Sequence, residues 1–404
     1  MNSPPYRWLI AGLLFFASAL SFFDRQVLSV LAPRILPDLG MTNVEYSHAV
    51  SAFTLAYSVM FTVGGRLVDF VGTRAGLGLT VAFWTVASLL HAGVRSSQQL
   101  VIFRFLLGAG EGGCFPGAAK GILEWFPARE RALAMGIATT GGSALGAVLA
   151  PPLIVWISSQ FGWRGAFIVT GLVGAVWTGL WFLFYRRPTV EQRPATASAS
   201  AERPWPIRNL LARKQVWGVV ITRFLLDPVF YFYMFWIPQY LNQQRGASIE
   251  DIGRLAWIPF FTLGVASLLG GGVSDALVRR NWSIGRARKT IMGAAALLTP
   301  TSILALIAPD AFWAVVLMGV LMFAHGFWMT NYMTLIGDLF PSSTVATVVG
   351  LTGTAGGLGG FLSTLLVGRF VEAYTFTPAF VLCGVLYPIG FAILLLTVPR
   401  VERL

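Results

Sequence analysis

Two related stretches of the sequence decide the fold: GRLVDFVGTR at residues 65–74 and GGVSDALVRR at residues 271–280. Each has a Gly, an Asp four residues later and an Arg five residues after the Asp, and the copies lie 206 residues apart. A single copy is compatible with a plain basic loop, whereas two copies favour a shared role. EWFP at 124–127 and DLFP at 338–341 form a second echo, 214 residues apart. The sequence therefore predicts two halves that repeat each other in parallel.

Long apolar segments surround these motifs. Of the 404 residues, 56% are apolar and 11% charged, whereas a soluble domain has about 25% charged residues. A spanning helix needs about 20 apolar residues, and barrel strands are shorter and alternate with polar positions. We therefore expect an all-α membrane protein with twelve spanning helices in two six-helix lobes around a central cavity. The segments run over about 8–34, 46–64, 75–93, 98–121, 132–158, 164–185, 215–241, 251–271, 290–308, 311–337, 345–371 and 376–398.

A polar stretch separates the two sets of six. Residues 186–214 read RRPTVEQRPATASASAERPWPIRNLLARK, rich in Pro, Ala, Ser and charge, which is typical of a linker. The segment from Pro206 to Lys214 is expected to form a short helix at the membrane surface. The predicted domains are an N-terminal lobe at 1–185, a cytoplasmic linker at 186–214 and a C-terminal lobe at 215–404.

The net charge of +12 is a topology signal and does not indicate nucleic-acid binding. Most Lys and Arg fall on alternate loops and on the termini, which predicts that these loops and both termini are cytoplasmic. They also favour contact with anionic lipid. We expect a multi-pass, monomeric protein of the bacterial inner membrane whose first apolar segment, from Trp8, is retained. The basic residues on these loops include Arg66, Arg74, Arg129, Arg131, Arg186, Arg187, Arg208, Arg213, Lys214, Arg279, Arg280, Arg286, Arg288 and Lys289.

The repeated motif suggests a gate. Gly allows two helices to approach closely, and Asp69 can cap the next helix or pair with a nearby Arg. We expect Asp69 and Arg74, with Asp275 and Arg280, to hold the cytoplasmic side closed until the lobes move.

Several ionisable groups fall at membrane depth, where each needs a partner or a function. Arg104 and Glu111 are seven residues apart, so they share one helix face about 10 Å apart. Arg25 can reach the same wall, and a guanidinium binds a carboxylate through two hydrogen bonds. The alternative is a structural Arg–Glu network between two helices. Arg223 and Asp227 are four apart and are expected to neutralise each other.

Two buried carboxyl groups are candidates for proton transfer. Asp24 and Arg25 are adjacent, so their side chains point about 100° apart, with Arg25 assigned to substrate and Asp24 to an adjoining pocket. Glu111 is expected to pair with Arg104 until a substrate carboxylate displaces it, after which Glu111 takes up a proton.

The chain resembles the major facilitator superfamily, and within it the bacterial hexuronate transporters of the anion–cation symporter branch. The resemblance is carried by FFDRQVLSVLAP (22–33), GEGGCFPGAAKGILEWFPARERALAMGI (110–137), FGWRGAFIVTGLVGAVWTGLWFLFYRRP (161–188) and RFLLDPVFYFYMFWIPQYL (223–241). It implies that Asp24 and Glu111 couple transport to protons, that Arg25 and Arg104 bind the anion, and that Tyr57 contacts substrate. At 139–143 the chain has TTGGS where a long amide is expected, which argues against an aldonate as substrate.

Other polar and aromatic side chains could contact the hydroxyl groups of a sugar acid, although each could equally serve packing. His325 lies opposite Glu111 by the 214-residue offset and is either a second proton site or a hydrogen-bonded core histidine. The remaining candidates are Tyr231, Trp236, Trp328, Asn331, Thr352 and Thr354.

These features predict proton-coupled symport of a small organic anion by alternating access, with a hexuronate first. The alternatives are another organic anion such as an aromatic or dicarboxylic acid, a drug–proton antiporter, and a receptor that does not transport. No Walker loop, zinc spacing or nucleophile elbow occurs, so we expect no enzyme activity and no cofactor other than the proton as coupling ion.

Overall fold

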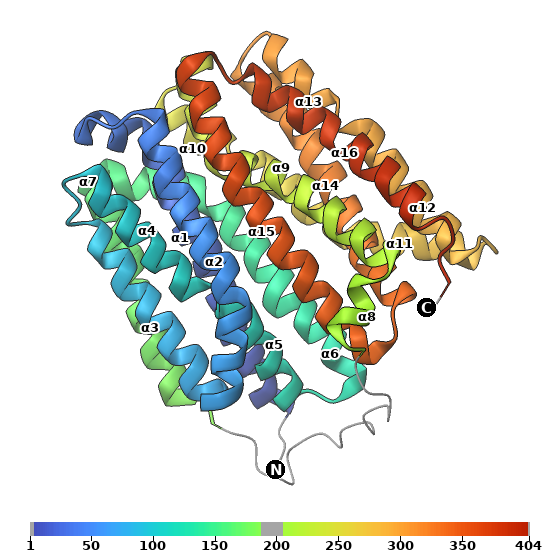
Figure 1. The fold of residues 1–404 in the computed structure, drawn as a ribbon. Helices are drawn as coiled ribbons and strands as arrows, with labels where there is room; N and C mark the ends of the chain where they lie inside the picture. Colours follow the sequence, from blue (N-terminus) through green and yellow to red (C-terminus); the bar gives the residue numbers. More distant parts are fainter. Residues whose placement is uncertain (1–3, 187–204, 403–404) are drawn as a thin grey trace. The chain divides into compact units, whose positions relative to one another are not determined.

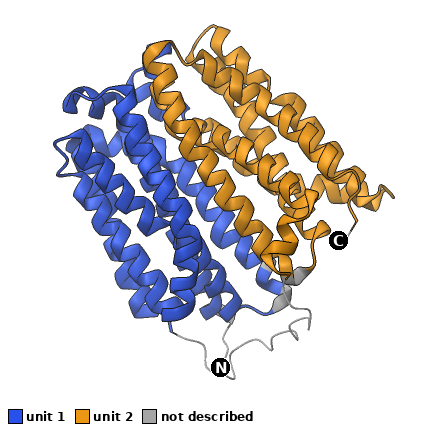
Figure 2. Cartoon of the chain, viewed as in Figure 1, with its two compact units in different colours: residues 1–199, 241–257 blue, residues 200–240, 258–404 orange. Residues whose placement is uncertain are grey.

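The computed structural model describes residues 4–186 and 205–402, and these residues form helices and short connections without any strand (Figure 1). By their contacts they cluster into two compact units (Figure 2). Unit 1 comprises residues 1–199 and 241–257, and unit 2 comprises residues 200–240 and 258–404. The lobe boundaries predicted at residues 185 and 215 stay predictions.

Unit 1 contains long helices, several of them interrupted. The predicted segment 98–121 is two helices that meet at Gly112 and Gly113. One helical stretch holds Gly162 at a non-helical φ of 69°, which separates two successive helices as the sequence predicted. The helices are α1 (Pro4–Leu39), α2 (Asn43–Val71), α3 (Thr73–His91), α4 (Ser97–Glu111), α5 (Cys114–Trp125), α6 (Ala128–Met135), the π-helical Gly136–Gly141, α7 (Gly142–Phe184) and α10 (Ile249–Leu255).

Unit 2 repeats the pattern of long helices. The short helix expected within Pro206–Lys214 is α8 (Ile207–Leu211), whereas most of the predicted linker, 187–204, lies outside the described residues. The remaining elements are α9 (Lys214–Arg245), whose last turn clusters with unit 1, α11 (Ile258–Arg279), α12 (Ile284–Leu298), α13 (Thr301–Leu304), the 3-10 turn Ala305–Ile307, α14 (Ala311–Leu339), α15 (Ser342–Ala373) and α16 (Thr377–Thr397).

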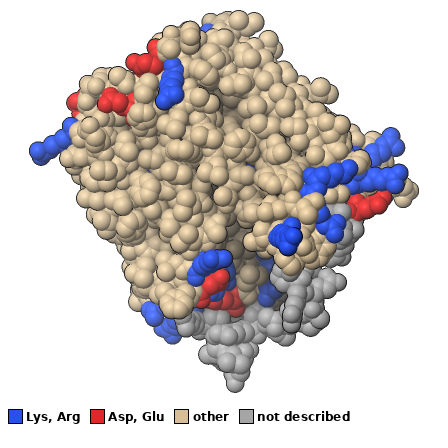
Figure 3. All heavy atoms as spheres, viewed as in Figure 1, with Lys and Arg blue, Asp and Glu red and all other residues tan. Residues whose placement is uncertain are grey.

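The surface of the helices suits lipid. Ten helical stretches of the described residues are long and apolar enough to cross a membrane. Large apolar side chains such as Leu268 and Leu396 are more than three-quarters exposed. On the face drawn in Figure 3, the charged side chains lie over the ends of helices and the middle is almost free of them. A helix surface of this kind is stable where lipid replaces water. The chain is therefore an all-α, multi-pass membrane protein.

The repeated motif is mostly helical rather than a loop, which corrects the predicted helix ends at 64 and 271. Residues 65–71 form the last turns of α2, and residues 271–279 form those of α11. In the first copy the chain turns at Gly72, whose φ is 86°, and after the second copy it turns at Asn281, whose φ is 63°. Next to the motif, α2 lies against the α4–α5 junction: a Cβ on Gly64 would lie 2.8 Å from Cα of Gly113, and a Cβ on Gly112 would lie 2.6 Å from Met60. Glycines on both sides of the contact, one of them just before the motif, thus allow α2 to pack on this junction.

Glycines also set the closest packing inside each unit. A Cβ on Gly146 of α7 would lie 2.1 Å from the carbonyl oxygen of Ala19 on α1. In unit 2, a Cβ on Gly360 of α15 would lie 2.2 Å from the ring of Tyr231 on α9. Gly146 and Gly360 are separated by the same 214 residues as the EWFP and DLFP motifs. The repeat therefore preserves a close helix pair in both halves.

Replacing Gly146 by Ala should destabilise unit 1, because the new methyl group would overlap the α1 backbone and force the helices apart. We expect the melting temperature of the purified protein to fall by several degrees, in line with an overpacking cost of about 1–3 kcal/mol. Gly179→Ala on the same α7 is the matched control, because a Cβ there meets nothing within 4 Å. Equal melting temperatures for the two variants would contradict the close α1–α7 packing.

Candidate functional site

Four charged side chains meet in the core of unit 1. Asp24 and Arg25 come from α1, and Arg104 and Glu111 come from α4. Each is at most 2% exposed. The structure thus brings together the four ionisable residues that the sequence singled out in the first half of the chain.

Arg25 and Glu111 form the central ion pair. Nε of Arg25 lies 2.7 Å from Oε2 of Glu111, and the hydroxyl of Ser21 donates to the same oxygen at 2.8 Å. Nη2 of Arg25 donates in turn to the Ser21 hydroxyl at 3.3 Å. The second oxygen of Glu111, Oε1, is buried and has no hydrogen-bond partner among the described residues. The pair joins α1 to α4 and leaves one carboxylate oxygen available.

Aromatic rings surround the guanidinium of Arg25. Its Cζ lies 4.3 Å from the ring centre of Tyr57, 4.7 Å from that of Phe22 and 5.5 Å from that of Phe53. Ring faces attract a cation and exclude water, so they hold the charge in place at low dielectric. Tyr57, a predicted substrate residue, therefore belongs to the same cluster.

Arg104 does not have the partner that the sequence predicted for it. We expected Glu111 to pair with Arg104, and this is wrong for the structure described, in which Glu111 binds Arg25. The spacing explains the difference, because two turns of helix separate Arg104 from Glu111 along the axis and α1 offers a nearer cation. Nε and Nη2 of Arg104 are buried without a hydrogen-bond partner in the described part of the chain. Arg104 is therefore the guanidinium with unused donors.

Asp24 faces away from Arg25, as the 100° step between neighbours requires. Its carboxyl group lies by Ser88 of α3 and Thr170 of α7, whose hydroxyl oxygens are 3.2 Å apart. Arg104 and Glu111 are its charged neighbours, and Oδ1 of Asp24 has no partner among the described residues. The Asp24 carboxyl group thus lies between α1, α3 and α7, and the adjoining pocket expected for it stays a prediction.

Unit 2 holds a separate ion pair. Nε of Arg223 lies 3.1 Å from Oδ2 of Asp227, which confirms the predicted pairing along α9. Nη1 of Arg223 donates to the hydroxyl of Thr352 on α15 at 3.4 Å. A Cβ on Gly356 would lie 1.9 Å from the Asp227 carboxylate, so only glycine leaves room for it. Thr352 is in this way connected to a charged group rather than standing alone.

His325 and its neighbours form an aromatic core in unit 2. Nδ1 of His325 is hydrogen-bonded to the hydroxyl of Tyr387, and the ring stacks on Phe230 at 5.4 Å. Trp328 packs edge-on against Tyr387 at 5.5 Å. This geometry is that of a hydrogen-bonded core histidine, and a part in proton coupling stays a prediction.

The other candidates in unit 2 are mainly packed inside it. The amide of Asn331 donates to the carbonyl oxygens of Gly270 at 3.1 Å and Phe327 at 2.9 Å, and so ties α14 to α11. Tyr231 and Trp236 are buried among aromatic rings of the unit, and Thr354 is half-buried on α15. Contact of these residues with substrate stays a prediction.

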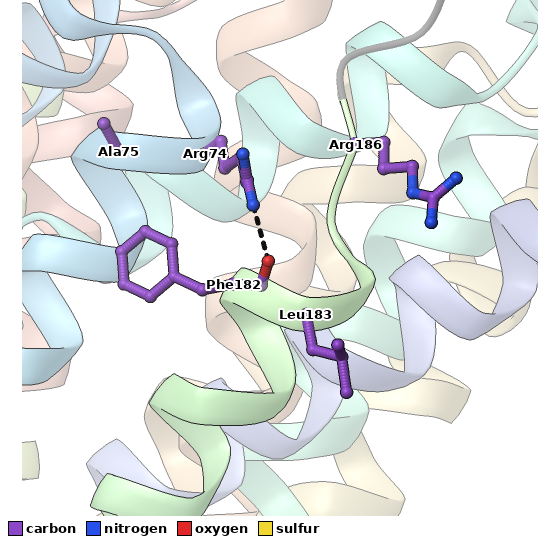
Figure 4. A pocket seen from close by; sticks show the side chains of 5 residues that line it. All are labelled: Arg74, Ala75, Phe182, Leu183 and Arg186. Carbon is purple, nitrogen blue, oxygen red and sulfur yellow. Dashed lines mark hydrogen bonds between the residues drawn. The ribbon is translucent and has the colours of Figure 1, made fainter.

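In unit 1, Asp69 of the motif pairs with a lysine and not with an arginine. Asp69 pairs with Lys120 of α5 at 2.9 Å, and Lys120 also donates to the carbonyl oxygen of Val68 at 3.0 Å. Nη2 of Arg74 instead donates to the carbonyl oxygen of Phe182 at 2.6 Å (Figure 4). Arg186 also lines the pocket drawn there, and its side chain points away from Arg74.

In unit 2, Asp275 pairs with Arg288 of α12 at 2.8 Å and not with Arg280. Five residues on a helix place two side chains about 140° apart, so the motif spacing itself points Arg280 away from Asp275. Arg288 also reaches Asp338 at 3.5 Å. The Asp residues of the motif therefore join neighbouring helices, and their part in gating stays a prediction.

The EWFP and DLFP echo has a structural meaning that the sequence did not reveal. Glu124 accepts hydrogen bonds from Thr73 at 2.8 Å and from Tyr185 at 2.6 Å. Asp338, its counterpart, holds Arg288. In both units this acid holds a side chain in the first turns of an earlier helix, α3 or α12. Sequence reasoning also missed Ser21, although it lies one turn before Arg25 and could have been found from that spacing.

Comparison with known proteins agrees with this picture. A 400-residue match to the hexuronate transporter of Escherichia coli strain K12 is 30% identical and covers 95% of this chain and 92% of the relative. The D-galactonate transporter of E. coli O6:H1 strain CFT073 is 29% identical over 98% and 96% of the two chains. These relatives are transporters, and so is this chain rather than an enzyme.

Solved structures support the same fold. The crystal structure of a bacterial homolog to the human lysosomal transporter Spinster, inward-facing and occupied, superposes with a TM-score of 0.76 at 20% identity over 98% of this chain and 96% of that one. The sequence model of the Major Facilitator Superfamily matches residues 14–364. This chain belongs to the major facilitator superfamily.

Proposed function

We propose that the protein moves a small organic anion, first of all a hexuronate, across the membrane together with a proton. The observation that carries the proposal is the buried set of Arg25, Arg104, Glu111 and Asp24, which combines two cations with two acids in an apolar core. Isolated charges at this depth are costly, so their retention favours a function. The transport of hexuronate and galactonate by the named relatives supports the class of cargo.

The substrate carboxylate is assigned to the two guanidinium groups. Arg104 has unused donors at Nε and Nη2, which suits a bidentate contact with a carboxylate. Arg25 is paired with Glu111 in the structure. Tyr57 lies against Arg25 and offers its ring and hydroxyl to the sugar.

Coupling follows from competition for Arg25. A substrate carboxylate that reaches Arg25 displaces Glu111, which would then be a buried acid without a cation beside it. Protonation removes that unfavourable charge. Loss of the proton on the other side restores the Arg25–Glu111 pair and releases the substrate. Asp24, beside Arg104 and Glu111, is the second acid that the proton can visit.

The architecture proposed for this cycle is twelve spanning helices in two six-helix lobes around a central cavity. Two features support twelve rather than ten spans. The helices α4 and α5 are each too short to be counted among the ten, and together they supply an eleventh span. Gly162 divides the long helical stretch 133–184 into two helices, which supplies the twelfth. We further propose a monomer in the bacterial inner membrane with both termini cytoplasmic, as the Lys and Arg distribution favours.

Removing either cavity guanidinium should abolish anion binding. Arg25→Ala and Arg104→Ala each delete charge-assisted hydrogen bonds, and Arg104→Lys lacks the planar fork, so all three should weaken D-glucuronate binding at least tenfold. Binding is measured by isothermal calorimetry on purified protein. Arg279→Ala is a control, since Arg279 is exposed in the last turn of α11. Near-parental affinity in the Arg104 variants would remove Arg104 from the site.

Glu111→Gln tests the coupling step directly. The amide imitates the protonated acid, so the variant should still exchange D-glucuronate across liposome membranes but lose accumulation driven by a pH gradient. Exchange and gradient-driven uptake are measured side by side with labelled substrate. If the variant accumulates substrate like the parent, Glu111 only braces α4 and the proton site lies elsewhere.

A further inference from the structure

A row of four polar side chains crosses the core of unit 1 from α1 to the end of α3. It consists of Asp24, Ser88, Thr170 and His91 and is called the file below. The hydroxyls of Ser88 and Thr170 lie 3.2 Å apart beside the Asp24 carboxyl group. His91, one turn further along α3 than Ser88, is the last residue of that helix. All four side chains are at most 3% exposed. Polar groups in such an apolar core are costly without a purpose.

The ring of His91 has a defined tautomer. Its Nδ1 lies 2.7 Å from the carbonyl oxygen of Ala87. Because a carbonyl oxygen only accepts, Nδ1 carries the hydrogen, and the neutral ring therefore has its lone pair on Nε2. Nε2 is buried and has no partner among the described residues. His91 is thus a proton acceptor held in place by the backbone of its own helix.

Two layers of contacts align His91 with the hydroxyl pair. The imidazole stacks on Phe167 of α7 at 4.9 Å with the planes 15° apart. Phe167 and Thr170 are three residues apart on α7, as Ser88 and His91 are on α3, so the two layers lie about 4.5 Å apart along the helices. The ring, the hydroxyl pair and the carboxyl group therefore follow one another in order.

The file begins close to the surface of the unit. Immediately after His91 the chain leaves the helix, and Gly93 and Arg95 are exposed. His91 is therefore the polar group of the file closest to the exposed end of α3, whereas Asp24 lies deeper.

We propose that His91 relays protons between that surface and Asp24. A proton binds the Nε2 lone pair and makes an imidazolium; the Nε2 proton then passes to a hydroxyl oxygen of the Ser88–Thr170 pair, and a hydroxyl proton of the pair passes to the Asp24 carboxylate. One proton enters the file and one arrives at Asp24, and the ring returns to its first tautomer with Nδ1–H still on the Ala87 carbonyl. The relay rests on the proposed proton coupling and adds its route.

The charges around His91 suit a relay rather than a proton store. Arg104 of α4 is close enough to repel a positive ring, and Asp24 of α1 is the acid that draws the proton on. The other elements in contact present Phe103 of α4 and Phe167 of α7, which carry no charge. A proton on His91 is therefore short-lived.

The test follows the protonation of Asp24 without any substrate. After a pH jump on the purified protein, time-resolved infrared spectroscopy records the carbonyl band of the protonated acid, identified by its loss in Asp24→Asn. We expect at least tenfold slower protonation in His91→Phe, which keeps the stacking, and in His91→Gln, which keeps a donor for Ala87. His48→Phe, on an exposed histidine, should match the parent. Imidazole should restore the rate in His91→Gly.

The outcomes separate the relay from a structural role and from the proposed function. The relay would be overturned if Asp24 were protonated at the parental rate in His91→Phe or in His91→Gln. It would also be overturned if imidazole did not restore this rate in His91→Gly, or if Asp24 were not protonated in the parent protein. If instead the infrared result is as expected but liposomes show no proton-driven uptake of D-glucuronate, the relay stands and the proposed cargo or coupling fails. Melting temperatures confirm that each variant is folded.

Discussion

The ion pair between Arg25 and Glu111 is the interaction on which unit 1 depends. Both side chains are removed from water, and the loss of hydration of two charges is repaid only when the geometry is close and the remaining polar atoms are satisfied. Ser21 and the ring of Tyr57 meet much of that need. Oε1 of Glu111 remains without a partner among the described residues. A pair of this kind is stable, yet a competing carboxylate can replace Glu111 as the partner of Arg25.

Glycines on α4 make this arrangement possible. Between Arg104 and Glu111 the helix reads FLLGAG, and a Cβ on Gly108 would lie 2.2 Å from the carbonyl oxygen of Phe53 on α2. On the opposite side, a Cβ on Gly110 would lie 2.6 Å from Trp84 on α3. Both neighbouring helices thus close over α4, and the charged ends of this segment are sealed from lipid. The sequence that carries the charges also carries the close packing that buries them.

Sequence reasoning found what repeats and what is anomalous. The helical class, the motif copies, the Arg223–Asp227 pair and the buried charges of α1 and α4 could all be read from spacing and composition. It could not assign partners, because a cation seven residues away on the same helix and one on another helix look alike in a sequence. Helix packing places Arg25, and not Arg104, beside Glu111. In the same way it places Lys120 beside Asp69 and Arg288 beside Asp275, in place of the arginines of the motif.

The two units share one helical scaffold but differ in their buried charges. The close glycine contacts occur in both units, and so does the acid that holds the first turns of an earlier helix, so these features belong to the fold. The charges do not repeat: Arg223 in unit 2 is neutralised by Asp227 one turn away on its own helix. In unit 1, by contrast, Arg104 and Asp24 both have buried polar atoms without a partner in the described chain. An incompletely satisfied core is a poor way to stabilise a helix bundle, so the cost falls where the proposed anion binding and proton transfer can use it.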